Sequence, residues 1–243
     1  MEEEHAKRGD ESLEPHISGK PTDGPISKTI NRKISTRITS YILSRNLPIT
    51  PNQISLLSFL TAAAASLLYV ARLPALAGVL VQTSSIIDGV DGELARARKI
   101  SSPVGAFVDS VLDRLADALI IISLTILAFD KWGLYGLFTG FAALLGSLMV
   151  SYVHSQGMAT LRTHVSGIGR IPMYASRDVR LFIIFLGSIV GAHIATLAVV
   201  AILSLSYVLL KTLDVYVAWR KGEINAELEH VESYSMHVKS ISR

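Results

Sequence analysis

Six long apolar segments limit what this 243-residue chain can fold into. A helix that spans a bilayer needs roughly 20 largely apolar residues. Half of the residues are hydrophobic and 18% are charged, whereas a typical soluble domain carries about 25% charged residues. The sequence therefore predicts an all-α integral membrane protein with six transmembrane helices, of which the fifth is short. The expected spans are 51–71, 74–99, 102–129, 132–161, 178–191 and 193–219.

An amphipathic segment over residues 26–44 precedes the first span. Its isoleucines recur every fourth residue at Ile30, Ile34, Ile38 and Ile42, with lysine and arginine between them. This pattern is typical of a helix that lies on an anionic membrane surface. The alternative, a helix packed on a soluble domain, is disfavoured because no soluble domain follows. The expected organisation is a flexible cytoplasmic tail (1–25), the juxtamembrane helix (26–50), the six-helix domain (51–222) and a second cytoplasmic tail (223–243).

The basic residues indicate how the chain is oriented. Four clusters, within 28–45, 96–99, 162–180 and 220–221, fall on one side of the predicted membrane. The other side has only Arg72 and Lys131 in its loops. Since cytoplasmic loops carry the excess of lysine and arginine, both termini are expected in the cytoplasm. The net charge of +3 is too small to indicate a nucleic-acid partner, and the absence of cysteine excludes disulfides.

Four aspartates interrupt the second and third apolar segments. Asp88 and Asp91 are three residues apart, and Asp109 and Asp113 are four apart, so each pair shares one helix face. The connection between the two helices is short, so they should run antiparallel and bring the four carboxylates together near the cytoplasmic side. An aspartate at the centre of a membrane helix costs about 2.5–3.5 kcal/mol on insertion scales, and neighbouring carboxylates repel one another.

A divalent cation would compensate for this repulsion. Carboxylate oxygens suit hard ions such as Mg²⁺, Mn²⁺ or Ca²⁺. The purely structural alternative pairs the aspartates with Arg96, Arg98 and Arg114. Gly92 and Gly105 favour a binding site, because a glycine inside a helix costs about 1 kcal/mol relative to alanine and allows a ligand to approach the backbone.

The spacing Asp88-x-x-Asp91-Gly92-x-x-Ala95-Arg96, followed after eight residues by Gly105-x-x-x-Asp109-x-x-x-Asp113, resembles the signature of the CDP-alcohol phosphotransferases. The resemblance extends over about residues 26–220, including "TPNQIS" at the start of the first span. It implies a membrane enzyme that transfers a phosphoalcohol from a CDP-alcohol to an acceptor hydroxyl and releases CMP. It also implies two Mg²⁺ or Mn²⁺ ions and a homodimer.

The resemblance also implies residue roles. Asp88, Asp91 and Asp109 would bind metal, and Asp113 would join them and act as the general base that takes the proton of the acceptor. We expect the CDP group to contact a set of residues around this cluster: Asn52, Asp88, Asp91, Gly92, Ala95, Arg96 and Gly105. The chemistry is consistent with these roles, because two metals held by carboxylates screen a diphosphate and stabilise its leaving group.

The segments "DGPISKTINRKISTRIT" and "QTSSIIDGVDGELAR" are most similar to the branch that makes di-myo-inositol phosphate phosphate from CDP-inositol and inositol phosphate. That branch often carries a cytidylyltransferase domain ahead of the membrane domain; here we expect a separate protein to supply CDP-inositol. A phosphorylated acceptor needs counter-charges, and Arg162, Arg177 and Arg180 are the candidates. The rivals are a phospholipid synthase that uses a CDP-linked lipid and, more remotely, a cation transporter. All four acids lie in one short segment, which argues against a transporter with repeated halves.

Overall fold

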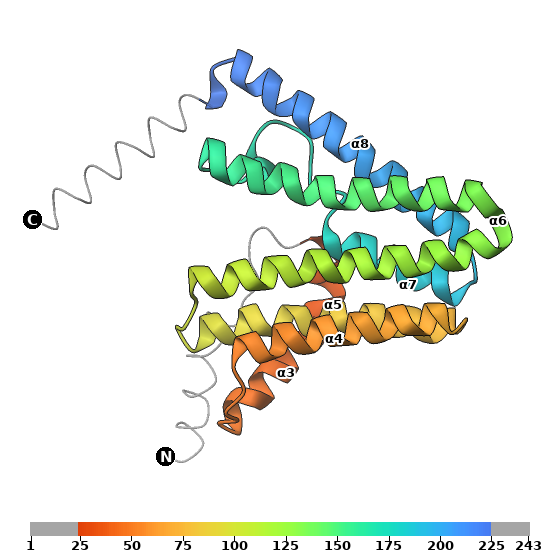
Figure 1. Cartoon of the computed structure of the whole chain (residues 1–243). Helices are drawn as coiled ribbons and strands as arrows, with labels where there is room; N and C mark the ends of the chain where they lie inside the picture. The colour runs from red at the N-terminus through yellow and green to blue at the C-terminus, as the bar shows by residue number, and fades with distance from the viewer. Residues whose placement is uncertain (1–23, 225–243) are drawn as a thin grey trace, which may run out of the picture.

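The computed structural model describes residues 24–224, and every regular element among them is helical. The all-α prediction is therefore confirmed for this part of the chain, whereas most of both predicted tails lies outside it. The elements are the short π-helix η1 (Ser27–Asn31), α3 (Arg32–Ser44), α4 (Pro51–Val70), α5 (Pro74–Ala97), α6 (Pro103–Leu161), the 3₁₀ turn η2 (Val165–Gly167), α7 (Arg177–Ile189) and α8 (His193–Arg220) (Figure 1).

Proline marks the start of three of the long helices. Pro51, Pro74 and Pro103 each occupy the first turn of their helix, where the missing N–H group costs nothing. Thr50 and Gln53 add a capping box ahead of α4, with the Thr50 N–H donating to Gln53 Oε1 over 2.8 Å. These local signals place the predicted starts of the first three spans within one residue of those observed.

The third and fourth predicted spans are the two arms of α6, which turn back on each other at Gly133 (Figure 1). Gly133 has φ +53° and ψ −136°, a backbone conformation that glycine adopts readily. A Cβ atom at Gly133 would meet nothing within 4 Å, so the backbone angle alone requires glycine. The arms close tightly beyond the turn, because a Cβ at Gly136 would lie 3.0 Å from the backbone of Ala128.

The helices form one bundle around an apolar core. Helix α6 packs against both α4 and α8, helix α5 packs against α4 and α7, and α3 crosses α5 (Figure 1). Tyr69, Ile120, Leu124 and Leu197 are fully buried where these helices meet. Helices α4 and α8 are long and apolar enough, by length and composition, to cross a membrane.

The isoleucines of the predicted surface helix differ in burial. The helix ends at Ser44, where the predicted amphipathic pattern also ends; Asn46 then has φ +48° and Pro48 follows. Ile34 is 42% exposed, whereas Ile42 is only 4% exposed and packs against α4 and α5. The stripe expected to face the membrane therefore turns into the core at its C-terminal end.

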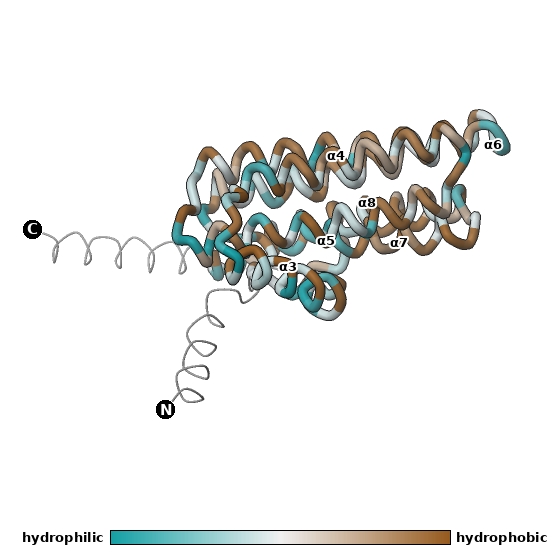
Figure 2. The backbone as a smooth tube through the Cα atoms, turned by 90° about the horizontal axis from the view of Figure 1, so that it is seen from below, coloured by the Kyte–Doolittle hydropathy of each residue, from teal (hydrophilic) through white to brown (hydrophobic). Residues whose placement is uncertain are grey.

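The two ends of the bundle differ in character. Hydrophilic residues gather at the end that contains the α5–α6 connection, and apolar residues follow the helices away from it, with a small hydrophilic tip at the α6 turn (Figure 2). Helix α7 has 13 residues, whereas α5 has 24. At 1.5 Å per residue, α7 is about 20 Å long. It begins inside the bundle, so its first residue, Arg177, can reach the aspartates.

Candidate active site

Three of the signature aspartates meet between α5 and α6. One carboxylate oxygen from each of Asp88, Asp91 and Asp109 lies within 4.8 Å of the other two. The short connection makes α5 and α6 antiparallel, which brings the two motif halves face to face. Asp91 is buried and the other two are half-buried. Three oxygen ligands of this kind, grouped in a partly dry site, fit a divalent cation such as Mg²⁺ or Mn²⁺.

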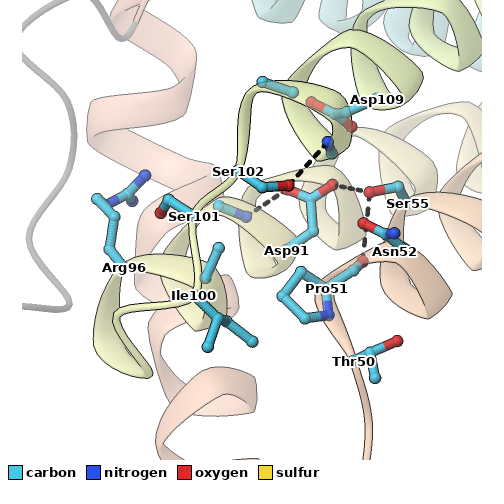
Figure 3. A pocket seen from close by; sticks show the side chains of 14 residues that line it. Thr50, Pro51, Asn52, Ser55, Asp91, Arg96, Ile100, Ser101, Ser102 and Asp109 are labelled. Atoms are coloured by element: carbon cyan, nitrogen blue, oxygen red, sulfur yellow. Dashed lines mark hydrogen bonds between the residues drawn. The ribbon is translucent and has the colours of Figure 1, made fainter.

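A serine from α4 orients the most buried of these carboxylates. Ser55 Oγ donates to Asp91 Oδ2 over 2.5 Å, and the Gly92 N–H donates to the other oxygen of Asp91. Both contacts appear as dashed lines around Asp91 in Figure 3. An outer partner of this kind fixes the orientation of a ligand. Ser55 was not among the predicted site residues, although it is the last residue of the "TPNQIS" segment.

Arg177 supplies positive charge to the cluster. Its Nη1 atom lies 2.9 Å from both Asp88 Oδ2 and Asp113 Oδ1, and its Nε atom lies 2.9 Å from Asp117 Oδ1. The side chain comes from the start of α7, far away in sequence. The arginine was predicted to bind the acceptor, and the structure places it directly between the signature acids.

The arginines considered as structural partners have other contacts. Arg98 donates to the backbone carbonyls of Leu47 and Ile49 and so ties the α3–α4 connection to α5. Arg114 lies 3.4 Å from Asp113 and donates to Ser151. The aspartates do form ion pairs, but chiefly with Arg177.

Arg180 lies one turn behind Arg177 and is 2% exposed. Its Nη2 lies 3.2 Å from Asp117 Oδ2, and its Nη1 donates to the Ala175 carbonyl over 2.6 Å. Two arginines and Asp117 thus lock the start of α7 to α6. Arg180 lines neither of the cavities next to the cluster, and its part in binding the acceptor stays a prediction.

A cavity of about 510 Å³ opens on one side of the cluster (Figure 3). The first turn of α4, the end of α5, the α5–α6 connection and the first turn of α6 form its walls. A Cβ atom at Gly105 would lie 3.0 Å from Ser102 Oγ and 3.4 Å from Asn52 Oδ1. The cavity is therefore narrow at Gly105. Six of the seven residues expected to contact CDP line it, Asp88 being the exception: Asn52, Asp91, Gly92, Ala95, Arg96 and Gly105.

A second cavity, of about 250 Å³, lies on the other side of the cluster. Asp88, Asp113 and Arg177 line this cavity and not the first. Arg162, which we expected to bind the acceptor, is exposed and lines neither cavity. The two cavities share four residues: Asp91, Gly92, Arg96 and Asp109.

A helical bundle that encloses a carboxylate cluster between two cavities is suited to bringing two polar substrates to one metal site. Known proteins similar to this chain are enzymes of this kind. Residues 48–221 match the family described as CDP-alcohol phosphatidyltransferase. The chain belongs to that family, which confirms the resemblance seen in the sequence and the enzyme class that it implied. Family members are integral membrane proteins.

Among curated proteins, the chain is 46% identical over 181 residues to a bifunctional IPC transferase and DIPP synthase of Rubrobacter xylanophilus, covering 72% of this chain and 38% of that protein. A protein of the same description from Archaeoglobus fulgidus is 41% identical over 172 residues, covering 70% of this chain and 33% of that protein. The chain therefore spans less than half the length of these relatives. An archaetidylinositol phosphate synthase of Pyrococcus horikoshii is 35% identical over 160 residues, covering 65% of this chain and 79% of that protein.

Among solved structures, the fold is similar to that of a phosphatidylinositol phosphate synthase of Mycobacterium tuberculosis with CDP-DAG bound. The TM-score is 0.62 at 22% identity, covering 76% of this chain and 94% of that chain. The same protein has been solved with manganese and citrate, with a TM-score of 0.62 at 21% identity and coverage of 75% and 89%. These structures support the helical architecture.

Proposed function

We propose that the chain transfers the phosphoalcohol of a CDP-alcohol to an acceptor hydroxyl. The acceptor oxygen forms a bond to the phosphorus that carries the alcohol, the bond from that phosphorus to the CMP oxygen breaks, and CMP leaves. The observation that carries this proposal is the carboxylate cluster of Asp88, Asp91 and Asp109, whose members line the walls of two adjoining cavities. One cavity can hold the donor and the other the acceptor, so that they meet at the cluster.

Different residues are proposed to bind the donor and the metal ions. We assign the donor to the larger cavity, where Asn52, Ala95 and Gly105 leave room for the cytidine and Arg96 faces its phosphates. We propose that Asp88, Asp91 and Asp109 hold two divalent cations, Mg²⁺ or Mn²⁺, with Asp113 available as a further ligand. Bound there, the cations would screen the diphosphate and stabilise the departing CMP.

Asp113 is the proposed general base. It lines the second cavity and not the larger one, so it lies on the side from which an acceptor hydroxyl would approach. A base must be within hydrogen-bond reach of the proton that it takes. Arg177, 2.9 Å from Asp113 Oδ1, positions this carboxylate against Asp88.

We further propose CDP-inositol as donor and inositol phosphate as acceptor, giving di-myo-inositol phosphate phosphate. Support comes from the bifunctional relatives described as DIPP synthases and from the arginines around the second cavity, which suit a phosphorylated acceptor. A CDP-linked lipid donor is the second candidate. It is favoured by the archaetidylinositol phosphate synthases among the relatives and by the CDP-DAG bound to the structural neighbour.

The proposed setting is a cell membrane crossed six times, with α3 on the cytoplasmic surface. In support, the α5–α6 connection, the end of α6 and the end of α8 share the hydrophilic end of the bundle and carry most of the loop arginines and lysines (Figure 1). That end also opens onto the carboxylate cluster, so the site and both termini are assigned to the cytoplasm. The homodimer implied by the resemblance remains part of the proposal.

CMP release from purified protein tests the function. The full chain in detergent would be incubated with Mg²⁺ or Mn²⁺, with inositol 1-phosphate as acceptor, and with either CDP-inositol or a CDP-linked lipid as donor. We expect CMP release with CDP-inositol that stops on chelation. Release only with the CDP-linked lipid would select the phospholipid synthase, and undiminished release after exhaustive chelation would contradict the metal-dependent mechanism.

A further inference from the structure

The first residue of the surface helix reaches the second cavity. Arg32 opens α3, yet it lines this cavity together with Asp88, Asp113 and Arg177. Its side chain is 14% exposed, so it is mostly enclosed by protein. Lys33 and Arg37, on the same helix, are exposed instead. A helix predicted only to lie on a membrane thus also supplies a cation to the interior of the site.

A buried acid holds Arg32 in this place. Glu93 lies inside the signature motif, one residue after Gly92, and is 0% exposed. Its Oε1 accepts from Arg32 Nη1 over 2.5 Å and from Ser35 Oγ over 2.6 Å, and its Oε2 accepts from Thr39 Oγ1 over 2.6 Å. A buried carboxylate is costly unless it is paired and hydrogen-bonded. All of these partners lie on α3, so Glu93 fixes the register of that helix against α5.

The residue before Arg32 is fixed as well. Asn31 is 2% exposed, donates from Nδ2 to Ser85 Oγ over 3.1 Å and accepts at Oδ1 from Gln82 Nε2 over 2.8 Å. Both partners belong to α5. The start of α3 is therefore anchored on either side of Arg32, and the guanidinium is preorganised at the cavity wall, which lowers the entropy that binding must overcome.

Two other arginines near the cavity form ion pairs with aspartates. Arg177 faces three carboxylates and Arg180 is buried against Asp117. Arg32 pairs with the carboxylate of Glu93, which also accepts hydrogen bonds from the hydroxyl groups of Ser35 and Thr39. A guanidinium has five N–H donors in a planar fork. Contact with Glu93 on one side is compatible with a bidentate contact to phosphate on another.

We propose that Arg32 is an acceptor-binding residue, which Glu93 orients so that its guanidinium receives the phosphate of a phosphorylated polyol in the second cavity. The assignment rests on the proposed function and specifies which side chain selects the acceptor. It gives the surface helix a direct part in substrate recognition. It also explains why Glu93, a residue without a role in the metal cluster, is buried inside the signature motif.

The test compares Arg32→Lys and Arg32→Ala with Arg37→Ala, a matched control that removes an exposed arginine from the same helix. The full chain would be assayed for CMP release from CDP-inositol, with inositol 1-phosphate and with unphosphorylated inositol. Because one charge-assisted contact to phosphate is lost, Arg32→Ala should raise the KM for inositol phosphate by about 10- to 100-fold. The KM for CDP-inositol and the turnover with unphosphorylated inositol should change less than about twofold, and Arg37→Ala should match wild type.

A purely structural role for Arg32 would give a different pattern. The double variant Ser35→Ala/Thr39→Ala weakens the docking of α3 and retains Arg32. If that variant raises the KM for inositol phosphate as much as Arg32→Ala does, or if Arg32→Ala changes both substrates equally, the proposal is wrong. Should the wild-type chain release no CMP from any CDP-alcohol, the proposed function itself fails. Normal wild-type turnover with an unchanged KM in Arg32→Ala overturns only this inference.

Discussion

The two cavities that meet at the aspartates differ in how they can neutralise phosphate. The larger cavity has hydroxyl, amide and small side chains on its walls, and Arg96 is its only lysine or arginine among the described residues. The second is lined by four arginines: Arg32, Arg96, Arg114 and Arg177. The difference indicates that a donor diphosphate would depend on cations held by the carboxylates, whereas an acceptor phosphate would be met by guanidinium groups.

The contrast follows from which segments build each cavity. The larger one is formed by helix starts and a connection rich in proline, glycine and serine, which keep bulky side chains away from the cluster. The second lies where the short helix α7 begins inside the bundle and α3 crosses α5. Both of these elements bring an arginine from a distant part of the sequence.

The carboxylates shared by both cavities should show the largest effect. Asp91→Asn and Asp109→Asn each remove a charged metal ligand from the common wall, so CMP release should fall by more than about 100-fold, the upper end of what losing an outer partner of a metal site costs. Metal binding, measured by calorimetry with Mn²⁺ on the purified protein, should weaken in parallel. If either variant keeps wild-type turnover after exhaustive chelation, the two cavities do not share a catalytic metal site.

Asp113 tests the division between the cavities, because it belongs to only one of them. Asp113→Asn should lower kcat by about 10²- to 10⁴-fold, the usual contribution of a general base, because asparagine cannot take the proton of the acceptor hydroxyl. The affinity for the CDP-alcohol should remain near wild type. If calorimetry shows Asp113→Asn losing donor affinity as severely as Asp91→Asn, the carboxylate is mainly a metal ligand and the two cavities are less distinct than proposed.

The sequence predicted the helical architecture and the grouping of Asp88, Asp91 and Asp109. Helix starts at Pro51, Pro74 and Pro103 follow from local chemistry, and the three- and four-residue spacings of the aspartates place them on facing helix surfaces. These features depend on neighbours within one or two turns. Most of the lining of the larger cavity lies within the signature segment, and the rest comes from the first turn of α4.

The second cavity depends on contacts that sequence spacing does not encode. Arg177 lies 60 residues from its partner Asp117, and Arg32 lies 61 residues from Glu93. The sequence predicted Arg177 as a cation for the acceptor phosphate, which stays a prediction, and did not predict its contacts with Asp88 and Asp113. Glu93 occupies an unspecified position of the signature, and its importance is evident only from its burial and its contacts with α3. The end of α3 at Ser44 coincides with the end of the amphipathic pattern over residues 26–44, because that boundary is a local feature of the sequence.

A smaller effect is expected where the larger cavity is narrowest. Gly105→Ala places a methyl group 3.0 Å from Ser102 Oγ and 3.4 Å from Asn52 Oδ1. Such crowding costs about 1–3 kcal/mol, so the KM for the CDP-alcohol should rise roughly tenfold while the KM for inositol phosphate stays the same. Gly167→Ala is the control, since a Cβ there meets nothing within 4 Å. Equal increases for both substrates would mean that the cavities are not separate compartments.

The smallest effect should come from Arg162, which the sequence suggested as an acceptor ligand and which the structure places on the exposed surface after α6. Its backbone has φ +54°, so Arg162→Asn, which tolerates that conformation, is a better test than alanine. Arg162 is the C-cap residue of α6, where asparagine can keep the left-handed conformation, and its side chain lines neither cavity, so neither KM should shift by more than about twofold. A tenfold rise in the KM for inositol phosphate alone would show that the segment between α6 and α7 folds over the acceptor. The second cavity would then extend beyond Arg32 and Arg177 to the surface of the bundle.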